Sequence, residues 1–176
     1  MGSFTLRQSE QSAHPHREAS RGEPRRVPLN LIFDYPVRWS RYKVLRDLIQ
    51  NFYDSIPRQA WAERFSHRIE QGRLTLVSKD VDFSYDWLIP IGASTKRDGD
   101  DNYAGYFGEG FKIAALCALR DFGWTIELRS RDWHLVVVTD ELDVDGRYLK
   151  TLAYDIRTGL EPAANTLLTI APFHDS

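Results

Sequence analysis

The stretch Gly105-Tyr106-Phe107-Gly108-Glu109-Gly110-Phe111-Lys112 places three glycines at G-x-x-G-x-G spacing, directly before an apolar run typical of a helix. Glycine lets the backbone approach a ligand closely. The first turn of a helix offers unpaired N–H groups at the positive end of its dipole. The stretch therefore predicts a cradle for a phosphate chain. The same glycines would also suit a flexible loop in front of an ordinary helix.

The composition is that of a globular domain. The chain has 176 residues, of which 42% are hydrophobic, and this is enough for one domain with a real core. The formal net charge of −2 gives no global attraction for nucleic acid or for anionic membranes. The single cysteine, Cys117, and the lack of a long apolar run predict a cytoplasmic protein without a membrane span.

The N-terminal residues differ in composition from the rest. Residues 1–26 are polar and without an apolar period, which predicts a flexible arm. The domain is expected to span residues 27–176, beginning with a short edge strand.

A first helix is predicted from Ser40, a favourable N-cap, to about Ser55. One side carries an apolar stripe, and the other carries Asp47, Asn51 and Asp54 within a narrow arc. Short Asp and Asn side chains in register favour a functional face, although a merely solvated face gives the same pattern.

The remaining segments predict one more helix and a set of strands. A second helix is expected from Pro57 to Gly72, because Trp61, Phe65 and Ile69 recur at every fourth position. Strands are expected at residues 73–79, 124–130, 133–139, 147–156 and 165–173, with a short helix or turn at 85–91 and a long polar loop at 92–104. This order predicts an α+β fold: a two-layer sandwich with a mostly antiparallel, mixed sheet and helices on one face.

Several of these segments together resemble the GHKL (Bergerat-fold) ATPases, a superfamily that includes the gyrase B subunit, the large heat-shock chaperone, MutL and the MORC proteins. The first motif of the family is a helix reading E-x-x-x-N-x-x-D, and here Asp47, Asn51 and Asp54 occupy its polar positions. The resemblance implies that Asn51 binds Mg²⁺ and that Asp47 acts as the general base of ATP hydrolysis. Asp47 stands where the family has Glu, one methylene longer.

Three further motifs follow in the family's order. Residues 92–96 resemble the G-x-S-T-K that opens the nucleotide lid, which implies nucleotide contacts for Ser94, Thr95 and Lys96. The glycine stretch at 105–112 resembles the family's phosphate-binding turn. Near the last strand, Thr166 resembles the threonine that supports the adenine-binding acid, with Thr169 as a second candidate.

The adenine-binding motif D-x-G-x-G departs most from the family. One alignment places Ser78 at the position of its Asp, with Asp80 and Asp82 where glycines belong. A shift of two residues makes Asp80 the acceptor, and this is the alternative we prefer from sequence. A third alternative is that adenine recognition is lost or altered.

The resemblance implies an ATP-binding domain that uses ATP and Mg²⁺ as a conformational switch or a slow ATPase. In related proteins a cation from a following domain completes the site, so a protein partner or a homodimer is expected to supply it here. The alternative is a degenerate, non-enzymatic interaction module, or a module for a different nucleotide.

Overall fold

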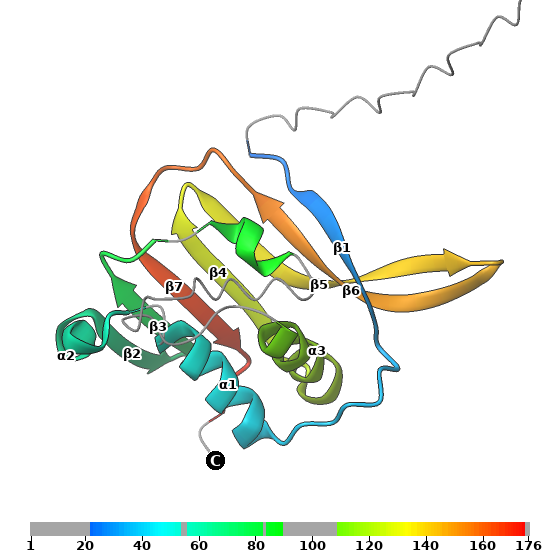
Figure 1. Ribbon diagram of the computed structural model, residues 1–176, viewed down its shortest axis with the longest axis horizontal. Helices are drawn as coiled ribbons and strands as arrows, with labels where there is room; N and C mark the ends of the chain where they lie inside the picture. Colours follow the sequence, from blue (N-terminus) through cyan, green and yellow to red (C-terminus); the bar gives the residue numbers. More distant parts are fainter. Residues whose placement is uncertain (1–21, 54–55, 83, 90–108, 175–176) are drawn as a thin grey trace, which may run out of the picture.

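A seven-stranded sheet forms the centre of the protein (Figure 1). The computed structural model describes residues 22–53, 56–82, 84–89 and 109–174. The strand order is β1-β6-β5-β4-β7-β3-β2, and every neighbouring pair is antiparallel. The strands are β1 (Arg25–Ile32), β2 (Phe65–Glu70), β3 (Arg73–Lys79), β4 (Thr125–Arg131), β5 (Trp133–Val144), β6 (Arg147–Arg157) and β7 (Ala163–Ala171).

Two helices longer than one turn pack against this sheet and against each other. They are α1 (Arg41–Tyr53) and α3 (Glu109–Phe122). Three short elements complete the described chain: the 3-10 helices η1 (Arg58–Ala60) and η2 (Tyr85–Leu88), and the single turn α2 (Trp61–Arg64). Among the residues described, none of the helices is long and apolar enough to cross a membrane.

The structure confirms the first predicted helix and its cap. Ser40 Oγ accepts a hydrogen bond from the backbone N–H of Lys43 at 3.3 Å, so it satisfies one of the free N–H groups at the start of α1. Val44, Leu48 and Phe52 are fully buried, as the apolar stripe predicts. The predicted strand at residues 73–79 and the short helix at η2 are also present.

The prediction of a second helix from Pro57 to Gly72 is wrong. Its first part is only η1 and α2, and Phe65 to Ile69 instead belong to β2, which pairs antiparallel with β3. Gln71 and Gly72 both have positive φ, 50° and 69°, and form the tight turn of the β2–β3 hairpin. Gly72 therefore turns a hairpin and does not end a helix.

The expected α+β two-layer sandwich with a mixed sheet, the Bergerat fold, is contradicted as well. Strands hold 47% of the structure and helices 27%, so this is a sheet-rich fold. The sheet has no parallel pair among the described strands. Figure 1 shows α1 and α3 over the middle of the sheet, while β1 and the far part of the β5–β6 hairpin are left uncovered.

The core lies between α3, α1 and the inner face of the sheet. Five consecutive residues of α3 are fully buried: Ala114, Ala115, Leu116, Cys117 and Ala118. Small side chains here let α3 approach both α1 and the strands closely. On β4 the alternate residues Ile126 and Leu128 are fully buried, and each apolar side chain of this size contributes about 1.5–3 kcal/mol.

Arg120, in the last turn of α3, attaches the segment between β1 and α1 to the core. Its guanidinium donates to the backbone oxygens of Phe33, Tyr35 and Val37 at 2.8, 3.0 and 2.6 Å. It also pairs with both carboxylate oxygens of Asp121 at 2.8 Å each. The hydrogen bonds from Arg120 hold the pKa of the Asp121 carboxyl below its usual range.

Candidate functional site

Three hydroxyl side chains form a buried row across one end of the sheet. Ser78 on β3, Thr166 on β7 and Ser130 on β4 are each 0% exposed. Ser78 and Thr166 are directly opposite in the β3–β7 ladder, and Ser130 Oγ lies 2.7 Å from Thr166 Oγ1. Thr166 Oγ1 also donates to the backbone oxygen of Val81 at 2.6 Å. We call these three residues the hydroxyl row.

Ser78 differs from the other two members of the hydroxyl row. Within the described chain its Oγ has no hydrogen-bond partner. A buried hydroxyl without a partner costs about 1–3 kcal/mol, so such a group usually meets a water or a ligand. The hydroxyl of Ser78 is therefore the one in the hydroxyl row that is available to bind a ligand or a water.

The last turn of α1 lies beside the hydroxyl row. The ring of Phe65, which is opposite Ser78 in the β2–β3 ladder, lies 6.5 Å from the ring of Phe52 and 4.9 Å from that of Tyr53. Asn51 directly precedes these two aromatic residues on α1. The side chain of Phe65 thus connects the end of α1 to the hydroxyl row.

The first turn of α3 reaches the same end of the sheet through residues 84–89. Lys112, which is 3% exposed, donates from Nζ to the backbone oxygen of Ile89 at 2.8 Å. At the start of the preceding short helix, the ring of Tyr85 lies 5.8 Å from that of Trp133, the β5 neighbour of Ser130. The phosphate-cradle motif and the hydroxyl row are therefore linked by η2.

The polar face of α1 is only partly described. The side chain of Asp47 is 19% exposed, and its Oδ1 pairs with Arg46 at 3.0 Å. Asn51 lies one turn further on the same face. The side chain of Asn51 and the whole of Asp54 lie outside the described residues.

Most of the predicted nucleotide loop also lies outside the described residues. This holds for Ser94, Thr95, Lys96, Gly105, Tyr106, Phe107 and Gly108, and for the side chain of Glu109. Gly110 and Phe111 belong to the first turn of α3, and the side chain of Phe111 is fully buried in the core. The described part of the stretch is thus already helical: α3 begins at Glu109, whereas the sequence placed the glycine stretch before the helix.

The structure separates the three candidates for base recognition. Asp80 and Asp82 are exposed, and Asp82 pairs with Arg131 at 2.6 Å on the surface. Only Ser78 is buried. Asp80 has a φ of 52°, a conformation that glycine adopts freely, and this suits the alignment in which a glycine belongs at position 80. The geometry therefore favours Ser78 over Asp80, which the sequence alone had favoured.

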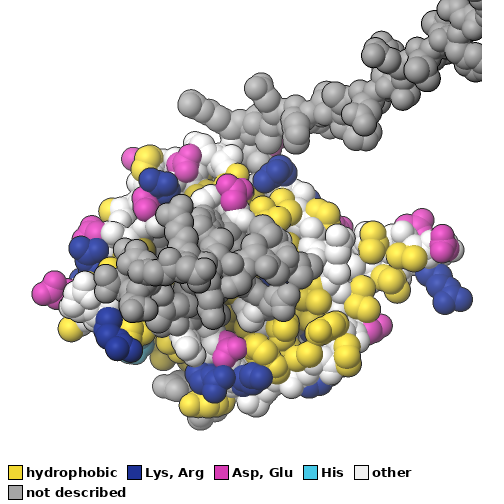
Figure 2. Space-filling model, viewed as in Figure 1, with side chains coloured by type: hydrophobic (Ala, Val, Ile, Leu, Met, Phe, Trp, Pro, Cys, Tyr) yellow, Lys and Arg dark blue, Asp and Glu magenta, His cyan; other side chains and the backbone are white. Residues whose placement is uncertain are grey.

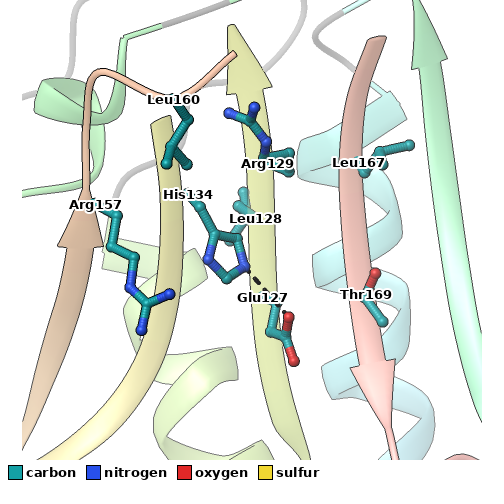
Figure 3. A pocket seen from close by; sticks show the side chains of 8 residues that line it. All are labelled: Glu127, Leu128, Arg129, His134, Arg157, Leu160, Leu167 and Thr169. Atoms are coloured by element: carbon teal, nitrogen blue, oxygen red, sulfur yellow. Dashed lines mark hydrogen bonds and ion pairs between the residues drawn. The ribbon is translucent and has the colours of Figure 1, made fainter. Parts of the chain in front are cut away.

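Thr169, the second candidate for supporting the base, lies on the other face of the sheet. Residues 166 and 169 are three apart on β7, so their side chains point to opposite faces. Thr169 lines a pocket of about 350 Å³ on this outer face, between β6, β5, β4 and β7 (Figure 3). Thr166 alone is placed to act with Ser78.

The pocket on the outer face contains a row of basic side chains from three neighbouring strands, β4, β5 and β6. His134 is opposite Arg157 on one side and Arg129 on the other. His134 Nε2 lies 3.3 Å from the carboxylate of Glu127, and Figure 3 shows this pair at the floor of the pocket. Arg129 donates to the backbone oxygens of residues 131, 133 and 161 and so holds the adjacent loop.

Sequence reasoning missed Ser130. Its signal was present, because Ser130 continues the alternating series Trp124, Ile126 and Leu128 and so occupies a core position. For metal binding, no three His, Cys, Asp or Glu side chains in the described part of the chain come together as a ligand group. Comparison of the chain with family models, with curated proteins and with solved structures finds no match.

Proposed function

We propose that this protein binds a nucleotide together with Mg²⁺ at the end of the sheet where the hydroxyl row, the last turn of α1 and the first turn of α3 meet. The observation that carries the proposal is the buried Ser78 hydroxyl without a partner in the described chain. Two further features support it. One is the polar residues Asp47 and Asn51 on α1, and the other is the glycine-rich sequence that leads into α3, because the first N–H groups of this helix suit phosphate oxygens.

Each piece has a separate role in this proposal. The first turn of α3, which begins at Glu109, binds the phosphates through its free N–H groups. Asn51 holds Mg²⁺, which would neutralise phosphate charge. Asp47 lies one turn earlier on the same face, where a carboxylate can orient water toward the last phosphate.

The hydroxyl of Ser78 has a consequence for the choice of base. A carboxylate can only accept hydrogen bonds, so it can pair with the amino group at C6 of adenine but not with the carbonyl oxygen that guanine carries at the same position. A serine hydroxyl both donates and accepts. It can therefore pair with the amino group of adenine or with the carbonyl oxygen of guanine. We expect weak discrimination between ATP and GTP.

The nucleotide acts as a conformational switch, with slow hydrolysis, in a cytoplasmic setting. Asp47 is shorter than glutamate and is already paired with Arg46, and both features disfavour fast turnover. A cation from a protein partner or from a second subunit would complete the charge stabilisation of the transition state. This part of the proposal is tested by measuring hydrolysis with and without self-association.

The binding proposal is tested by calorimetric titration of the full chain with Mg-ATP and Mg-GTP. Ser78→Ala removes only the hydroxyl and is expected to weaken nucleotide binding about three- to tenfold. Thr75→Val is the control, because Thr75 is also a buried hydroxyl residue of β3, 8% exposed, and lies on the opposite face. Unchanged affinity in Ser78→Ala would show that the hydroxyl does not meet the ligand.

A second pair of variants tests the metal. Asn51→Ala is expected to abolish the gain in affinity that Mg²⁺ provides, while Gln50→Ala, its exposed neighbour, retains it. If the chain binds neither nucleotide at millimolar concentration in the presence of Mg²⁺, the proposed function is wrong.

A further inference from the structure

We infer that the open edge of β5 binds an extended, basic peptide segment by strand addition. β5 and β6 pair along their whole length, from His134 opposite Arg157 to Val144 opposite Arg147. β4 pairs only with the first part of β5, ending at Val136. Residues 137–144 of β5 therefore have no strand beside them on the β4 side among the described residues.

The two edges of this hairpin are not equivalent. On the β6 side, β1 pairs as far as Thr151, and the N–H of Phe33 then donates to the backbone oxygen of Lys150 at 2.9 Å. Most of β6 is thus already covered. The outer side of β5 is the longer open edge, and such an edge is a template for another strand. One of its residues is already engaged, because the backbone oxygen of Thr139 accepts a hydrogen bond from Arg26 at 3.2 Å.

Apolar side chains are exposed on the same hairpin. Leu142 is 38% exposed, Val144 43% and Tyr148 72%. They make up half of the large hydrophobic residues that are exposed in the described chain. Figure 2 shows hydrophobic side chains along the projecting hairpin and charged ones at its tip. A two-stranded ribbon with exposed apolar groups is marginally stable by itself, so added contacts would stabilise it.

The charges on β5 define the partner. Asp140, Glu141 and Asp143 lie on its open part, and Asp145 follows in the turn. Two of these acids have a basic neighbour: Arg26 of β1 lies 3.8 Å from Asp140, and Lys150 of β6 is opposite Glu141 in the β5–β6 ladder. Asp143 and Asp145 add further negative charge near the tip. A second copy of the chain would bring the same acidic residues against this edge and be repelled. A strand with Lys or Arg at alternate positions would instead complement it, with its backbone supplying the hydrogen bonds.

This binding surface is separate from the proposed nucleotide site. The hairpin projects beyond β1, on the opposite side of the molecule from α1 and α2 in Figure 1. The two proposals can therefore fail independently, because one is measured with nucleotides and the other with peptides.

The probe is a fluorescein-labelled eight-residue peptide of alternating valine and lysine, titrated with the full chain and followed by fluorescence polarisation. Its matched control has glutamate in place of lysine. We expect saturable binding of the lysine peptide, weakened by added salt, and at least tenfold weaker binding of the glutamate peptide. Two further peptides carry N-methyl groups at alternate residues, so that each blocks the backbone N–H groups along one of the two edges of the bound strand. We expect the peptide that is blocked on the edge facing β5 to lose binding, and the other to retain it.

Variants of the chain place the binding on β5. The double variant Glu141→Gln, Asp143→Asn is expected to weaken binding of the lysine peptide at least fivefold. The control double variant Glu63→Gln, Glu161→Gln changes two exposed acids elsewhere and should leave that binding unchanged. Equal binding of both charge types, or no effect of either N-methylated peptide, would overturn the inference. Self-association that Leu142→Ser with Val144→Ser abolishes would also overturn it, because the occupant would then be a second copy.

Discussion

Ser78 and Thr166 face each other across the β3–β7 ladder, yet only Thr166 is hydrogen-bonded within the described chain. Thr166 Oγ1 contacts both Val81 and Ser130, so its hydroxyl holds two neighbouring segments together. Ser78 Oγ contributes nothing comparable to the fold. This difference separates a structural hydroxyl from one that is available for a ligand.

In the absence of ligand, removal of the Thr166 hydroxyl should lower the stability of the fold, whereas removal of the Ser78 hydroxyl should not. Thr166→Val leaves the oxygen of Val81 and the hydroxyl of Ser130 without their partner, and we expect a loss of about 1–3 kcal/mol in the free energy of unfolding. Ser78→Ala removes an unsatisfied group, and we expect no loss. Urea denaturation measures both. Equal destabilisation by the two variants would contradict the assignment.

Arg120 should be sensitive even to a conservative change. Arg120→Lys keeps the charge but loses the planar fork that reaches three backbone oxygens and Asp121 at once. We expect a loss of about 1–3 kcal/mol, because the partly buried carbonyls of Phe33 and Val37 lose their donor. Thermal or urea unfolding tests this, with Arg46→Lys on the exposed side of α1 as the control. A loss below about 1 kcal/mol would show that these contacts are not cooperative.

The Arg120–Asp121 pair should also make stability depend on pH. The pKa of Asp121 lies below its ordinary value of 3.8 in the folded protein, through the hydrogen bonds from Arg120. The pair therefore contributes stability above about pH 4, and this contribution is lost as the pH falls through the folded pKa. We expect Asp121→Asn to be less stable than the wild type at pH 7, with the difference shrinking toward pH 2. An unchanged difference would argue against the pair.

Cys117 should be unreactive in the folded state. It is fully buried in α3, and its Sγ lies 3.8 Å from the backbone oxygen of Val37 and 3.7 Å from the guanidinium of Arg120. A thiol reagent can reach it only when the segment at residues 33–37 opens. We expect slow labelling in buffer and immediate labelling in denaturant. Labelling in Arg120→Lys should be faster, and an equal rate in both proteins would contradict this coupling.

The local patterns predicted much of the fold. Ser40 with the apolar stripe predicted α1, and strict alternation predicted β3 and β4. β2 could not be predicted in this way, because Phe65 and Ile69 are four residues apart. That spacing places two side chains on one face of a helix and also on one face of a strand. Pairing with β3 decides between them, and it depends on residues far from either.

The candidate site was predicted in part. The sequence named Ser78 as a less favoured candidate for the base acceptor, after Asp80, and Thr166 as the first candidate for the supporting threonine. The structure shows that these two residues are opposite each other in one ladder. The alternating series places Ser130 at a core position, but it does not associate this residue with Ser78 or Thr166. Proximity between β3, β4 and β7 is a property of the sheet order, which no local pattern contains.

The strand order also determines when the parts can assemble during synthesis. β4, β5 and β6 are consecutive hairpins and can pair as soon as they leave the ribosome. β1 is made first but pairs with β6, and Arg26 lies 129 residues before its partner Asp155. β7, the last strand, joins β3 to β4. β2 and β3 must therefore wait for the final strand, and we expect nascent chains that stop before residue 163 to leave this hairpin undocked.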